Sequence, residues 1–213
     1  MRKNKKAEIR KPEILENYYQ VLIEEGFEGA SIGKIAKRMD IHPSLIIHYF
    51  KSKDNMTFEL VELLIEKYLE PGFLNFNHIT DLEQRFYTLI DTIFSIEWSR
   101  TINPGLHFGF YYLSFRNPAI HERYMAMIKQ FRDYLISELE LFRENGILKI
   151  DDVKKAADII VTLMEGLEFH SHFLSEEKPF EEFANYAKNL VLALLKHDGL
   201  KLDLKRPGKP MAG

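Results

Sequence analysis

Residues 31–53 read SIGKIAKRMDIHPSLIIHYFKSK, and this stretch predicts two short helices joined by a tight turn. Ser31 suits the N-cap of the first helix because its hydroxyl oxygen can accept a backbone N–H. Residues 40–42 interrupt the apolar pattern, and Pro43 suits the first turn of the second helix, where its missing N–H costs nothing. The apolar residues that recur at helical spacing are Ile32, Ile35, Ala36 and Met39 in the first helix and Leu45, Ile46, Tyr49 and Phe50 in the second.

This pair of helices has two interpretations. In a helix-turn-helix, the second helix enters the major groove of DNA while the first helix crosses the backbone. Helices of the same length also occur as neighbours in ordinary helical bundles. The spacing alone therefore leaves both interpretations open.

The flanking segments favour the first interpretation. Residues 12–25 predict an amphipathic helix that ends at Gly26, a natural C-terminal stop. Residues 52–54 begin another helix, which should run to about Leu69. In this order, the pieces EEGFEGAS, IGKIAKRM and HYFKSKDNM resemble the DNA-binding domain of the TetR family of bacterial transcriptional regulators. The resemblance covers about the first quarter of the chain and implies that the protein binds double-stranded operator DNA.

Composition and charge agree with a DNA-binding protein that presents one end to phosphates. Residues 1–53 contain eleven Lys/Arg and seven Asp/Glu, a net charge of +4, whereas the whole chain of 213 residues carries −3. A basic N-terminal segment on an otherwise acidic chain fits such a protein. The lysines at residues 3–6 can equally belong to a mobile, solubilising tail. No apolar run approaches the ~18–20 residues of a membrane span, so we expect a cytoplasmic protein without a membrane partner.

The rest of the chain predicts helices throughout. Thr80 and Glu83 form a capping-box pattern that opens a helix to about Ser99. Further helices are predicted over residues 103–116, 117–144, 151–174 and 180–197, and no segment shows the alternation of a strand. The predicted fold is all-α, with about nine helices. A three-helix DNA-binding domain with a basic arm would span residues 1–53, a larger effector-binding and dimerisation domain residues 54–198, and a tail residues 199–213.

The resemblance implies which residues contact DNA. Members of the family read base edges from the first turn of the recognition helix, which here holds His42, Pro43 and Ser44. Ser44 can hydrogen-bond to a base or a phosphate, and Pro43 can contact a thymine methyl. His42 can cap the helix or reach a phosphate. The phosphate contacts that the resemblance implies are Ser31, Lys34, His48, Tyr49 and Lys53. For His48 and Tyr49 the alternative is packing between helices.

Three positions depart from the family pattern. The turn glycine is Asp40, and aspartate reaches the left-handed conformation less readily than glycine. Leu45 replaces a common threonine and Ile47 a common tyrosine, and neither can donate a hydrogen bond to phosphate. The operator can therefore differ from familiar ones, or affinity can depend more on Lys53 and the basic arm.

The same resemblance implies a homodimer. One short recognition helix makes few base contacts, whereas a two-fold dimer reads two half-sites. The last two long helices would form the interface, and their apolar surface exceeds what one buried face needs. The alternative is a thick intramolecular core. The apolar positions concerned are Ile159, Ile160, Leu163, Met164, Leu167, Phe183, Tyr186, Leu190, Val191, Leu194 and Leu195.

The larger domain, through YYLSFRNPAIHERY and ENGILKIDDVKKAADIIVTLMEGLEFHSHF, resembles the ligand-binding domain of BetI-like members of the family. This resemblance implies an unidentified small-molecule effector. Aromatic residues and methionines crowd the predicted helices, and most of them belong to packed core. Our candidates for an apolar ligand pocket are Trp98, Phe108, Tyr111, Tyr112, Met164 and Phe169, with Glu97, Arg100, His107 and His170 as polar anchors.

Catalysis is not expected. The sequence has no cysteine, no phosphate-binding glycine loop, and no pair of histidine or glutamate residues at the spacing that holds a metal on a helix. We predict no catalytic residues, no metal site and no cofactor. The favoured function is a TetR-type transcriptional repressor released by a small molecule. The alternative is a constitutive helical DNA-binding or interaction protein without an effector.

Overall fold

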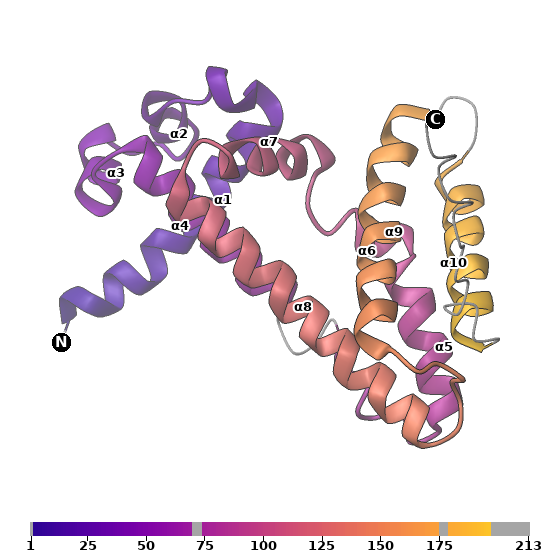
Figure 1. Cartoon of the computed structure of the whole chain (residues 1–213). Helices are drawn as coiled ribbons and strands as arrows, with labels where there is room; N and C mark the ends of the chain where they lie inside the picture. The colour runs from indigo at the N-terminus through magenta and orange to yellow at the C-terminus, as the bar shows by residue number, and fades with distance from the viewer. Residues whose placement is uncertain (1, 70–73, 175–178, 197–213) are drawn as a thin grey trace, which may run out of the picture. The chain divides into compact units, whose positions relative to one another are not determined.

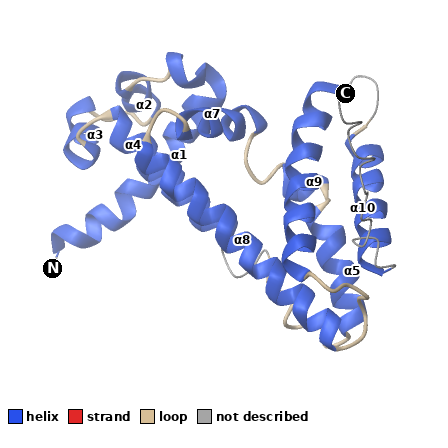
Figure 2. Cartoon of the chain, in the orientation of Figure 1, coloured by secondary structure: helices blue, strands red, loops and turns tan. Residues whose placement is uncertain are grey.

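A computed structural model describes residues 2–69, 74–174 and 179–196, and every regular element in these ranges is an α-helix (Figure 2). The prediction of an all-α protein is confirmed. The described residues form ten helices, one more than expected, because the predicted helix over residues 80–99 is two helices. These are α5 (Leu82–Ile93) and the short α6 (Ile96–Ser99). The predicted tail over residues 199–213 lies outside the described residues.

The chain folds into two compact units. The first contains residues 1–75 and 99–131, and the second contains residues 76–98 and 132–213. Helix α8 (Pro118–Glu144) contributes its first half to one unit and its second half to the other. These units do not coincide with the predicted boundary at residue 53, and a division of function at that boundary stays a prediction.

Helix α1 (Arg2–Gly29) opens the first unit and starts earlier than the sequence suggested. The predicted start near Pro12 is wrong, because the backbone is helical from Arg2 onward and Pro12 lies inside the helix. Gly26 interrupts α1 with a φ of 69°, a left-handed conformation that glycine adopts without steric cost. The predicted stop at Gly26 thus falls where the regular helix breaks, and one further turn follows it.

Helices α2 (Ile32–Arg38), α3 (Pro43–Phe50) and α4 (Lys53–Leu69) pack with α1 around one apolar core (Figure 1). Ile35 of α2 and Ile46 and Phe50 of α3 are at most 1% exposed in this core. Beneath them, the hydroxyl of the fully buried Tyr18 lies 2.7 Å from that of Thr57. Burial raises the pKa of Tyr18, so this phenol stays neutral and its hydrogen bond persists across the physiological pH range.

Helix α7 (Pro104–Ser114) belongs to the same unit and lies against α1. Its N-cap residue, Asn103, donates its backbone N–H to the hydroxyl of Tyr19 over 3.1 Å. Farther along, the ring of Phe27 meets that of Phe110 edge to face, with 5.3 Å between ring centroids. These contacts fix α7 along the second half of α1.

The second unit is built from α5, the end of α8, α9 (Val153–Leu174) and α10 (Phe180–Lys196), and α9 and α10 lie side by side (Figure 1). The N-cap of α5 is Asp81, which accepts the backbone N–H of Gln84 over 3.0 Å, so the predicted cap at Thr80 is wrong by one residue. Both residue types can cap a helix. None of the described helices is long and apolar enough to span a membrane.

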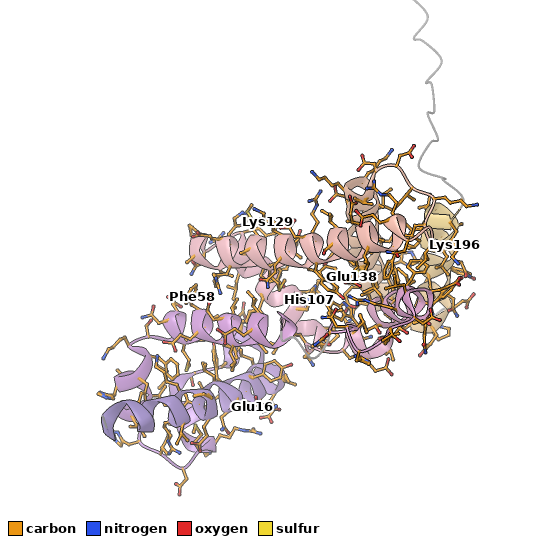
Figure 3. All side chains as sticks on the ribbon, turned by 90° about the horizontal axis from the view of Figure 1, so that it is seen from below. Glu16, Phe58, His107, Lys129, Glu138 and Lys196 are labelled. Carbon is orange, nitrogen blue, oxygen red and sulfur yellow. The ribbon has the colours of Figure 1, made fainter. Side chains whose placement is uncertain are left out.

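A buried ion pair joins α5 to α8 inside this unit. Arg85 donates from Nε and Nη2 to the two carboxylate oxygens of Glu138, over 2.8 and 2.5 Å. The two side chains are only 11% and 6% exposed, and Figure 3 shows Glu138 among the crowded side chains of the second unit. The carboxylate raises the pKa of Arg85, and a bidentate pair of this geometry offsets the desolvation of both charges.

We expect Glu138→Ala to destabilise the protein strongly, by about 3–5 kcal/mol, because it leaves the Arg85 guanidinium buried without its partner. Urea denaturation followed by circular dichroism measures this change. Asp158→Ala is the matched control, since it breaks the solvent-exposed pair between Asp158 and Arg132 in the same unit. Equal losses from the two variants would show that the buried pair has no special weight.

Candidate nucleic-acid interface

The first helix of the motif is capped as its sequence predicts. Ser31 is the N-cap of α2, and its hydroxyl oxygen accepts the backbone N–H of Lys34 over 3.3 Å. After α2 the chain reverses through Asp40, whose φ is 51°. The backbone N–H of Ile41 then bonds to the carbonyl of Ala36 over 3.0 Å and closes the turn. Asp40 therefore adopts the left-handed conformation that the turn requires.

The second helix is capped by a histidine. His42 is the N-cap of α3, and its Nδ1 accepts the backbone N–H of Ser44 over 3.3 Å, while the hydroxyl of Ser44 lies 2.7 Å from the same nitrogen. Pro43 occupies the first helical position. Of the two roles expected for His42, the structure shows the cap.

Helix α3 presents one face to solvent and buries the other. Ser44, Ile47 and His48 are exposed, and at positions i, i+3 and i+4 they share one face of the helix. Ile46 and Phe50 are buried on the opposite side. Because the buried pair fixes the rotation of the helix about its axis, the exposed row is held in a defined orientation.

Ile47 is a candidate contact that the sequence analysis did not select. Its side chain is 47% exposed, although isoleucine is among the residue types most often buried. Ile47 cannot donate a hydrogen bond to phosphate, but its apolar side chain can contact a thymine methyl. The helical spacing from Ser44 would have identified it.

The predicted phosphate contacts on α2 are accessible, but they have intramolecular partners. Ser31 and Lys34 are exposed. The ammonium of Lys34 lies 2.7 Å from a carboxylate oxygen of Glu25, and Arg38 binds both oxygens of Glu24 at 2.8 Å. Such solvent-exposed pairs contribute little to stability, so an approaching phosphate can replace the carboxylate at small cost.

Lys53 is placed differently from the other predicted contacts. It is the first residue of α4, and its ammonium donates to the backbone carbonyls of Phe27 and Ala30, each over 2.6 Å. Tyr49 is half-buried, and its ring meets that of His48 edge to face at 5.4 Å. Tyr49 also packs against the apolar core of the first unit, as one of its two interpretations expects, while part of it remains accessible.

The predicted ligand-pocket residues do not fall within one compact unit. Phe108, Tyr111 and Tyr112 belong to the first unit, and the two tyrosines are 51% and 61% exposed. The residues in the second unit are Trp98, Met164, Phe169 and His170; Phe169 is 59% exposed, and the ring of His170 lies 4.7 Å from that of Phe183.

The hollows in the described part of the second unit include the following two. One is a cavity of about 10 Å³ between α9 and α10, lined by Ile159, Ile160 and Leu194 among others. The other is an open groove along the second half of α8, lined in part by Ser137, Glu140 and Lys154. Neither is lined by a predicted pocket residue. Among the described residues, no group of three or more histidine, aspartate or glutamate side chains could hold a metal ion.

These features define a helical protein with an N-terminal helix-turn-helix, and the comparisons with known proteins identify its family. Residues 14–60 match the model of the bacterial regulatory proteins of the tetR family. Residues 81–197, more than half of the chain, match the tetracyclin repressor-like C-terminal domain. The chain belongs to the TetR family of DNA-binding transcriptional regulators. No curated protein matches it significantly.

Solved structures share this fold at low sequence identity. A TetR transcription regulator from Haloarcula marismortui is 17% identical, with a TM-score of 0.78, over 89% of this chain and 100% of that chain. A putative transcriptional regulator from Saccharomonospora viridis in complex with choline is 15% identical, with a TM-score of 0.76, over 88% and 98% of the two chains. One from Pseudomonas aeruginosa is 22% identical, with a TM-score of 0.69, over 88% and 90%.

The turn at Asp40 yields a test of the motif's geometry. We expect Asp40→Val to lower the free energy of unfolding by about 1–2 kcal/mol, because a β-branched residue resists the left-handed conformation. Asp40→Gly, which adopts this conformation freely, should leave stability unchanged or slightly raised. Chemical denaturation of both variants measures the difference. Equal stability of the valine and glycine variants would contradict the turn described here.

Proposed function

We propose that this protein is a homodimeric repressor that binds operator DNA through α2 and α3 and is released by a small molecule. The observation that carries the proposal is the exposed row of Ser44, Ile47 and His48 on α3, held in place by the buried Ile46 and Phe50. A helix oriented in this way can insert its exposed face into a major groove. Since the proposed partner is operator DNA, we place the protein in the cytoplasm.

The proposed contacts divide into two classes. Ser44, Pro43 and Ile47 would contact base edges and carry sequence information. The phosphate contacts, which set the position of the protein on the duplex, would be Ser31, Lys34, His42, His48 and Tyr49. Lys53 is an exception among the predicted contacts, because its ammonium is already bound to two carbonyls.

A homodimer is supported by the apolar residues that α9 and α10 leave in solvent. Phe169 and Phe173 of α9 are 59% and 62% exposed, and their rings pair at 4.7 Å. Tyr186 and Leu190 of α10 are 55% and 49% exposed. Exposed apolar surface of this kind marks a protein interface. The alternative of an intramolecular core holds for part of the predicted set, because Ile160, Leu167, Val191 and Leu195 are buried within the chain.

A small-molecule effector is supported by the choline bound in the structurally similar regulator from Saccharomonospora viridis. We propose that this chain also binds a small organic molecule, with the six predicted apolar lining residues and the polar anchor His170 as candidate contacts. The ligand would act by a population shift, favouring a spacing of the two DNA-binding heads that does not fit successive major grooves. A constitutive DNA-binding protein would instead keep the same operator affinity with every metabolite tested.

Selection of bound duplexes from random DNA, with and without a metabolite library, tests operator and effector together.

On the selected duplex, we expect Ile47→Asp to lower affinity at least a hundredfold, because a carboxylate enters a groove lined with phosphates. Ile23→Asp is the matched control, since Ile23 is an isoleucine of the same unit that is 41% exposed on α1. Failure to select any duplex, or equal losses from both variants, would refute the proposed reading face.

For the dimer, we expect Leu190→Arg to produce monomers, because it places a charge in the apolar surface of α10 that the partner would bury. Sedimentation equilibrium at micromolar concentration measures the molecular mass. Tyr112→Arg, at an exposed position of the first unit, should leave the mass unchanged. A wild-type protein that is monomeric would contradict the proposal directly.

A further inference from the structure

Lys53 joins the two ends of the helix-turn-helix. Its ammonium binds the carbonyl of Ala30, two residues before α2 begins at Ile32. Lys53 itself follows the last residue of α3, Phe50, by three positions. One side chain therefore links the two ends of the segment that contains both helices of the motif. This segment follows α1 and precedes α4.

The environment of the ammonium explains why it lies there. The carbonyls of Phe27 and Ala30 belong to the turn that ends α1, and helix C-termini attract cations through their unpaired carbonyls. The backbone of Lys53 is held as well. Its carbonyl accepts the hydroxyl of Thr57 over 2.9 Å, and that hydroxyl lies 2.7 Å from the buried phenol of Tyr18. Lys53 is thus tied to α1 through both its side chain and its main chain.

The ring of Phe27 gives the contact between Lys53 and the end of α1 a second support. It packs edge to face on Phe110 of α7, and it fills the space beside Gly109 so closely that a Cβ there would lie 2.2 Å from Cε2 of Phe27. The ring of Phe27 therefore keeps this position only because Gly109 has no side chain, and the backbone of the same residue supplies one acceptor of Lys53.

We propose that Lys53 is a positioning residue, which orients the recognition helix by clamping α4 to the end of α1, and that it does not bind phosphate. The inference rests on the proposed recognition of an operator. A phosphate contact supports specific and non-specific binding alike, and its loss makes the salt dependence less steep. A positioning residue affects only how well α3 fits one DNA sequence. Its loss therefore lowers the affinity for that sequence and leaves the affinity for other DNA unchanged.

The test uses Lys53→Met in the full-length protein, with a duplex selected from random DNA and a scrambled duplex of equal length. We expect affinity for the selected duplex to fall about tenfold or more, with affinity for the scrambled duplex and the slope of log K against log salt concentration unchanged. Lys129→Met, at an exposed lysine of α8, controls for the lost charge. If Lys53→Met weakens both duplexes equally and reduces the slope by about 0.9 per protomer, the proposal is wrong.

Gly109→Ala disturbs the clamp without changing any charge. The added Cβ displaces the ring of Phe27, so we expect the same selective loss on the selected duplex. Gly166→Ala on α9, where a Cβ meets nothing within 4 Å, is the matched control. Unchanged operator affinity in folded Gly109→Ala protein would contradict the role given to Phe27.

A measurement on the wild-type protein removes any dependence on how the variants fold. In a complex with the selected duplex, the ¹⁵N-labelled ammonium of Lys53 should show no scalar coupling to a backbone ³¹P nucleus. Such a coupling would overturn the proposal while leaving operator binding intact. If the wild-type protein selects no duplex, the proposed function fails, and this result is distinct from a failure of the clamp.

Discussion

Burial of Ile46 and Phe50 decides which face of α3 meets solvent, and the proposed DNA contacts depend on it. Burying each of these side chains contributes about 1.5–3 kcal/mol. Turning the helix to bury Ile47 instead would expose both of them and leave Ser44 and His48 in an apolar core. The cost of exposing Ile46 and Phe50 exceeds the contribution of any single exposed contact, so the core fixes which face of α3 meets solvent.

The cations of the first unit are held with different strengths, and this difference separates their roles. Lys34 pairs with a carboxylate in solvent, where the attraction is screened and a phosphate can compete. The ammonium of Lys53 is half-buried between two carbonyls, and moving it to a phosphate would break both hydrogen bonds. We therefore infer that the same type of side chain provides an exchangeable contact in one place and a fixed contact in the other.

Local rules predicted most of the fold. The cap at Ser31, the proline start of α3 at Pro43, and the stop after Glu144 depend on neighbouring residues, and the structure confirms all three. The errors occurred where distant contacts or competing local choices decide. The extension of α1 before Pro12 is accompanied by a bond between Lys11 and Glu59 of α4, 48 residues away. No local pattern reveals such a partner.

The candidate site likewise combines features that neighbouring residues decide with features that distant contacts decide. The exposed face of α3 follows from helical periodicity, which would also have selected Ile47. The partners of Lys53 could not be predicted, because Phe27 and Ala30 offer backbone carbonyls, which every residue has. The pocket residues were chosen by composition, and composition does not distinguish a packed aromatic residue from one that lines a cavity or a partner surface.

Hydroxyl-radical footprinting of the selected duplex tests the central claim most directly. Two symmetric heads, each with α3 in a major groove, should protect two segments whose centres lie about one helical turn, ~10 base pairs, apart on one face of the duplex. A single protected segment, or two segments on opposite faces, would contradict the account.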